Sequence, residues 1–182
     1  NAIGIMNAFL DDDRVNLYGF EAGGEGPESG RHAIRFAPGT GELGMFQGAK
    51  SYLLENSEGQ TLDTYSISAG LDYASVGPEH AWLKDIGRVT YSWATDGEAM
   101  SAFKDLCETE GIIPAIESSH AIAGAYKAAL DLKAKGYEHP VMIINVSGRG
   151  DKDMNTAGKW FGYLTDEQSK ALEANGAQGN NA

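Results

Sequence analysis

Cysteine and basic residues are both scarce in this sequence. The 182 residues include one cysteine, Cys107, so the chain can hold no internal disulfide framework. That usage is typical of a reducing compartment, and we expect a cytoplasmic protein. Only 14 Lys and Arg oppose 26 Asp and Glu, which leaves a net charge of −12. Nucleic-acid binding needs clustered positive charge that displaces counterions, so we expect no nucleic-acid partner.

Long apolar runs and targeting signals are also missing. No run approaches the roughly 18 residues of a membrane span, so we expect no membrane partner. The opening stretch, NAIGIMNAFLDDDR, has neither a basic start nor a small-residue cleavage site, which argues against a signal peptide. It also has no initiator Met. We therefore expect that the sequence is a piece of a longer protein.

Helical and strand patterns alternate along the chain, which is long enough for one domain with a substantial core. Its 24 glycines predict many tight loops, above all over residues 22–45. We expect helices over 2–10, 78–87, 96–111, 118–136 and from about 151, and strands over 15–22, 88–95 and 140–146. This order predicts a parallel sheet with helices on both faces and a ligand site at the carboxyl ends of its strands.

Three stretches contain candidate site residues. The apolar run 140–146 leads into SGRGDKD (147–153), where Ser147 can meet a ligand or Asp151 can cap a following helix. In AIESSHA (115–121), Ser118 or Ser119 can cap a helix, or Glu117 can face a ligand. The turn-rich loop 66–80 carries Asp72, and its carbonyls could bind a cation or be an ordinary surface.

Four motifs, taken together, resemble one family. NAIG, YSISAGLDY-SVGPEHAWL, EGIIPAIESSHA and NVSGRGDKD stand in the order and spacing of the C-terminal half of the tryptophan synthase β chain. The resemblance covers residues 1 to about 160, and the last two motifs together are highly specific. Ala74 stands where the family usually has proline.

The resemblance implies a fold and an activity. The family consists of pyridoxal-phosphate enzymes with two three-layer α/β/α domains built on mostly parallel sheets, and this chain would hold an incomplete C-terminal domain. We expect residues 1–163 to form that partial cofactor-binding domain and 164–182 to be a frayed polar tail. The activity is the lyase reaction that joins L-serine to indole by β-replacement. The implied partners are an indole-releasing α subunit and a second β chain.

The resemblance also implies roles around the cofactor ring. Ser147 would hydrogen-bond the pyridine nitrogen, and Gly148 would lie against the ring. A hydroxyl leaves that nitrogen largely unprotonated, which suits β-elimination and addition. Glu117 would stand beside the cofactor. Asp72 would engage the substrate when the site closes.

Phosphate and cation sites are implied as well. Asn1 matches the last residue of the family's glycine-rich phosphate loop, whose phosphate lies at the N-terminus of the next helix. Tyr73 and Ser75 fall where backbone carbonyls hold a monovalent cation such as Na⁺ or K⁺.

The lysine that binds the cofactor has no counterpart among the nine lysines of this sequence. In the family that lysine belongs to a motif in the N-terminal half. We therefore predict that the 182 residues alone are inactive. Two alternatives stay open: another pyridoxal-phosphate enzyme of the same fold, such as a threonine synthase or serine dehydratase, and a non-catalytic α/β domain that binds a phosphate ligand.

Overall fold

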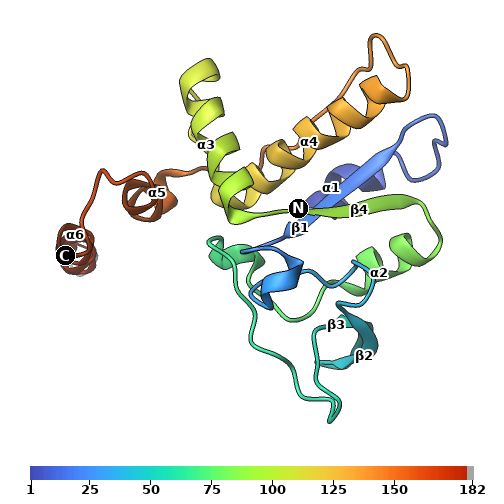
Figure 1. Cartoon of the computed structure of the whole chain (residues 1–182), viewed down its shortest axis with the longest axis horizontal. Coiled ribbons are helices and arrows are strands. Elements are labelled where there is room, and N and C mark those ends of the chain that lie inside the picture. Colours follow the sequence, from blue (N-terminus) through green and yellow to red (C-terminus); the bar gives the residue numbers. More distant parts are fainter. Residues whose placement is uncertain (180–182) are drawn as a thin grey trace.

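The computed structural model describes residues 1–179, and Figure 1 shows the arrangement of its elements. In chain order the elements are α1 (Ala2–Asn7), β1 (Leu17–Ala22), η1 (Pro27–Ser29), β2 (Glu42–Phe46), β3 (Ala49–Leu53), η2 (Ala69–Leu71), α2 (Pro78–Asp85), β4 (Val89–Ala94), α3 (Asp96–Glu110), α4 (Ile116–Ala134), η3 (Asp151–Asp153), α5 (Met154–Trp160) and α6 (Asp166–Gly179).

Two strand pairs form the sheets. β1 and β4 run parallel, in a register that pairs Leu17 with Val89 and Ala22 with Ala94. β2 and β3 form an antiparallel hairpin whose turn residues, Gln47 and Gly48, both have positive φ. Such a turn matches the twist of the flanking strands. The parallel pair with its helices confirms the predicted α/β class.

Helices cover both faces of the parallel pair. On one face, α3 and α4 pack on β4, and on the other face α1 and α2 do so; Figure 1 shows α4 and α2 on opposite sides of the strands. The first contact buries Ala94, Ala102, Ile122 and Ala123, and the second buries Met6, Leu83 and Val89. The predicted layering of helices on both faces is therefore confirmed.

Local signals explain where the helices begin and end. At the start of α3, the Glu98 amide donates to Thr95 Oγ1 at 3.3 Å, and the Thr95 amide donates to Glu98 Oε2 at 2.8 Å. This reciprocal pair is a capping box. Gly111, with φ +67°, ends α3, and Pro78 opens α2. Glycine tolerates that left-handed conformation without a Cβ clash.

The predicted strand over 140–146 is wrong. The segment is extended but forms no strand, and its apolar side chains face outward, with Val141 94% and Ile143 76% exposed. Within the described part of the chain, residues 141–146 make no backbone hydrogen bond. A strand needs a hydrogen-bonded neighbour, and no strand among the described residues pairs with this segment.

The last part of the chain, for which the sequence predicts a helical start and then a frayed polar end, holds one more helix. α6 occupies Asp166–Gly179, and residues 180–182 lie outside the described residues. The boundary at residue 163 stays a prediction. Among the described residues, no helix combines the length and the apolar character needed to cross a membrane.

Gly124 provides the first testable prediction. A Cβ at this position in α4 would overlap the ring of Phe20 on β1. We expect Gly124→Ala to lower the free energy of unfolding by about 1–3 kcal/mol, although alanine favours a helix. Urea unfolding measures this change. Gly97→Ala in α3, where a Cβ meets nothing within 4 Å, is the control and should not destabilise. Equal effects of the two changes would contradict the packing described.

Candidate functional site at the carboxyl ends of β1 and β4

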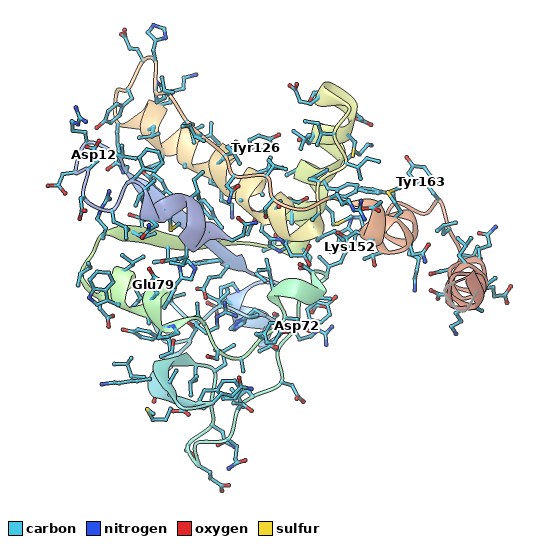
Figure 2. The ribbon with its side chains drawn as sticks, turned by 180° about the vertical axis from the view of Figure 1, so that it is seen from behind. Asp12, Asp72, Glu79, Tyr126, Lys152 and Tyr163 are labelled. Atoms are coloured by element: carbon cyan, nitrogen blue, oxygen red, sulfur yellow. The ribbon has the colours of Figure 1, made fainter. Side chains whose placement is uncertain are left out.

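The loop 66–76 lies at the carboxyl ends of the parallel strands. The Ile67 amide donates to Oδ2 of Asp96, a buried residue just after β4, at 3.1 Å. Three residues on, the Gly70 amide donates to Glu117 Oε1 at 3.0 Å. These two bonds tie the loop to the start of α3 and to the start of α4. Asp72 lies two residues after Gly70, at the end of η2, and Figure 2 shows it on the same side of the molecule as Lys152.

Glu117 is held by a lysine that the sequence analysis gave no role. Lys152 Nζ lies 2.9 Å from Glu117 Oε2 and 2.7 Å from Asp153 Oδ1. Burial by itself raises the pKa of Glu117, but the bonds from Lys152 and from backbone amides outweigh it, so the pKa lies below its ordinary value. Glu117 is therefore a carboxylate at neutral pH.

Asp153 caps α4 from a distant part of the chain. Its Oδ2 accepts the Ile116 amide at 2.9 Å, and neither Ser118 nor Ser119 caps the helix. The capping interpretation of the two serines is therefore wrong. Ser119 instead donates to the Ala115 carbonyl of its own helix at 3.1 Å.

The Ser118 hydroxyl binds both the carbonyl and the amide of Ser147. Its hydroxyl donates to the Ser147 carbonyl at 2.7 Å and accepts the Ser147 amide at 3.1 Å. The two hydroxyl oxygens lie 3.4 Å apart, and the Ser147 residue is half-buried. Ser147 is thus fixed beside the first turn of α4, the turn that carries Glu117.

Glycines and Asn1 complete this side of the site. Gly148 has φ +70°, a conformation that glycine adopts without strain. A Cβ on Gly150 would overlap the Pro114 carbonyl, so the chain passes close to the segment before α4. Asn145 Nδ2 donates to Asn1 Oδ1 at 3.1 Å, which places residue 1 next to the segment that leads into Ser147.

Tyr73 and Ser75, the predicted cation ligands, are tied to other elements. The Tyr73 carbonyl accepts a hydrogen bond from Arg35 Nη1 at 2.6 Å. Ser75 forms an isolated antiparallel bridge with Leu53 of β3. In the residues described here, no cluster of three His, Cys, Asp or Glu side chains could hold a metal ion.

The structure therefore brings most of the predicted residues together. Glu117 and Ser147 meet through Ser118, and Asp72 lies two residues after the amide that binds Glu117. Sequence reasoning missed Lys152 and Asp153, although both belong to the SGRGDKD motif, and it missed Arg35, which no motif marked.

The fold is that of an α/β protein, and its polar residues gather at the carboxyl ends of the parallel strands, where such folds hold ligands. By sequence, the chain is a homologue of the tryptophan synthase β chains along most of its length. No family model matches it.

Three relatives illustrate the similarity. The tryptophan synthase β chain of Mycobacterium tuberculosis (strain H37Rv) is 60% identical over 164 residues, and that of Mycobacterium leprae is 58% identical over 165. These matches cover 90% of this chain and 38% of each relative. The β chain of Streptomyces coelicolor is 49% identical over 177 residues, 97% of this chain and 40% of the relative. The chain thus spans less than half the length of the relatives it matches.

Removal of the Ser118 hydroxyl tests how Ser147 is held. Ser118→Ala leaves the amide and the carbonyl of Ser147 without their partner, which we expect to cost about 1–3 kcal/mol of unfolding free energy. Hydrogen exchange at the Ser147 amide should also become faster. Ser119→Ala is the matched control, because that hydroxyl bonds only within its own helix. Unchanged exchange at Ser147 in Ser118→Ala would show that this clamp is not needed.

Proposed function

We propose that this chain is the C-terminal portion of a tryptophan synthase β chain, a cytoplasmic lyase of tryptophan biosynthesis. The parent enzyme would join L-serine to indole by β-replacement and release water. One observation carries the proposal: Ser147, Glu117 and the Asp72 loop gather at the carboxyl end of the parallel pair, in a chain 60% identical to named β chains. The identity extends over 90% of the chain, well beyond the site motifs.

The residues present fit pyridoxal phosphate on one side of a pocket. Among the described residues, the Ser147 hydroxyl has one hydrogen-bond partner, the Ser118 hydroxyl at 3.4 Å, so it keeps the capacity for a stronger hydrogen bond. Gly148 has no side chain to obstruct a flat ring. Asp72 Oδ1 is buried without a hydrogen-bond partner among the described residues, as expected of a group that meets a ligand.

Pyridoxal phosphate, when bound, would supply the electron sink for β-replacement. The Ser147 hydroxyl would donate a hydrogen bond to the ring nitrogen, or accept one from it, without bringing a negative charge. A neutral partner favours an unprotonated nitrogen and a moderate sink. Ser118 fixes the backbone of Ser147 and thereby the direction of its side chain.

The two acidic residues would act on the other atoms. Glu117 is kept charged by Lys152 and by the Gly70 amide, so it would order the ring and exclude competing anions. Asp72 would orient the substrate side chain. Because the Gly70 amide binds Glu117, a movement of the Asp72 loop is coupled to the carboxylate at the cofactor.

The remaining ligands and partners belong to the same proposal. Asn1 would close the phosphate loop. The resemblance places a monovalent cation on the Tyr73 and Ser75 carbonyls, but the Tyr73 carbonyl already accepts a hydrogen bond from Arg35. An indole-releasing α subunit and a second β chain would be the protein partners.

Activity of the isolated chain tests the missing lysine motif. We expect the purified 182 residues to make no tryptophan from L-serine and indole above the background of a blank preparation, because no lysine stands where the cofactor would be bound covalently. Tryptophan fluorescence after chromatography measures the product. Turnover by a sample whose intact mass excludes full-length enzyme would contradict the prediction.

A chimera tests the function itself and the role of Ser147. The N-terminal part of the Mycobacterium tuberculosis β chain, joined to residues 1–182, should convert indole and L-serine to tryptophan. Ser147→Asp in this chimera should lower that rate roughly tenfold or more, because a carboxylate holds a proton on the ring nitrogen. Ser147→Thr keeps the hydroxyl and is the matched control. A folded, cofactor-loaded chimera that prefers phosphohomoserine would favour a threonine synthase instead.

A further inference from the structure

A buried ion pair contacts the loop that carries Asp72. Arg35 is 7% exposed and Glu21, on β1, is 5% exposed. Arg35 Nε lies 2.9 Å from Glu21 Oε1. The same carboxylate accepts the backbone amides of Arg35 at 3.0 Å and Phe36 at 2.9 Å. Glu21 therefore fixes both the main chain and the side chain of Arg35 against the sheet.

The Arg35 guanidinium also holds the loop that carries Asp72. Arg35 Nη1 donates to the Tyr73 carbonyl at 2.6 Å, a short, charge-assisted bond. Tyr73 directly follows Asp72, whose Oδ1 is buried without a partner in the described part of the chain. The direction of the Asp72 side chain therefore depends on a backbone that Arg35 holds.

Stability alone gives little reason for such a pair. Desolvation of two buried charges offsets much of their attraction, and apolar residues of similar volume often serve as well. Burial raises the pKa of Glu21, against the lowering effect of Arg35 and the two amides. The carboxylate thus depends on the guanidinium to remain charged.

A free monovalent cation does not fit well beside this arginine. The resemblance places such an ion on the Tyr73 and Ser75 carbonyls, but the Tyr73 carbonyl already binds a guanidinium. A cation on the same carbonyl would lie within a few ångströms of the guanidinium, which would repel it. The buried positive charge is already supplied by the chain.

We propose that Arg35 is a positioning residue that serves as a built-in cation for the loop carrying Asp72. Glu21 anchors the guanidinium, the guanidinium orders the Tyr73 carbonyl, and the order of that carbonyl sets the position of Asp72. The catalytic part of this inference rests on the proposed function. The ordering of the loop does not, because it follows from the contacts of Glu21, Arg35 and Tyr73.

Removal of the arginine should create a cation site. Arg35→Ala in the chimera leaves the Glu21 carboxylate and the Tyr73 carbonyl around an open space of suitable charge. We expect its thermal midpoint to fall by roughly 5 °C or more. KCl or CsCl should restore most of this loss with a saturable dependence, and tetramethylammonium chloride at equal ionic strength should not. The unmutated chimera should respond equally to all three salts.

Three variants separate charge from general damage. Arg31→Ala removes an exposed guanidinium four residues before Arg35, which is paired with Glu25 at 3.0 Å. This variant should show no ion-specific rescue. Arg35→Lys keeps a positive charge and should need less added cation than Arg35→Ala. Arg35→Met combined with Glu21→Gln removes both charges and should lose the rescue, because no carboxylate is left to attract an ion.

Three results would overturn the proposal. The Arg35→Ala chimera could respond alike to potassium and tetramethylammonium, or it could stay unfolded in both salts. The unmutated chimera could also show the same saturable potassium response. The thermal readout needs no turnover, so it stands even if the chimera makes no tryptophan. In an active chimera, Arg35→Ala should lower kcat with recovery in KCl, and failure of that recovery alone would break the link between Arg35 and Asp72.

Discussion

The contact between α4 and β1, where the ring of Phe20 lies over Gly124, is the constraint on which the rest of the structure depends. Because Gly124 has no side chain, the Phe20 ring packs directly on the backbone of α4. The helix therefore lies close to the parallel pair, and its first turn lies at the strand ends. That turn carries Glu117 and Ser118. The close packing of one glycine thus determines where the polar groups of the site stand.

From this turn, the site is assembled by bonds between segments far apart in the sequence. Ser118 holds Ser147, Asp153 caps α4, and the Gly70 amide binds Glu117. Each bond satisfies a backbone group that would otherwise be unpaired near the end of an element. The same bonds that complete the helix therefore also order the groups that face the proposed cofactor.

The apolar segment 141–146 is exposed although it has the composition of a buried strand. It has no hydrogen-bonded neighbouring strand in the described residues. The chain spans 38% of the length of the relatives it matches. An exposed apolar run of this kind is a surface on which another strand or another chain can pack.

The sequence by itself determined the α/β class and the approximate positions of α2 and α3, because turns and hydrophobic periodicity are local signals. That Glu117 and Asp72 belong to one site was implied by the family resemblance. Tertiary structure alone decided that Ser118 holds Ser147 and does not cap its helix, and that Arg35 reaches Tyr73. Those partners are 29 and 38 residues away along the chain. No local pattern reports which distant group a buried hydroxyl or guanidinium will meet, since that depends on how the elements pack.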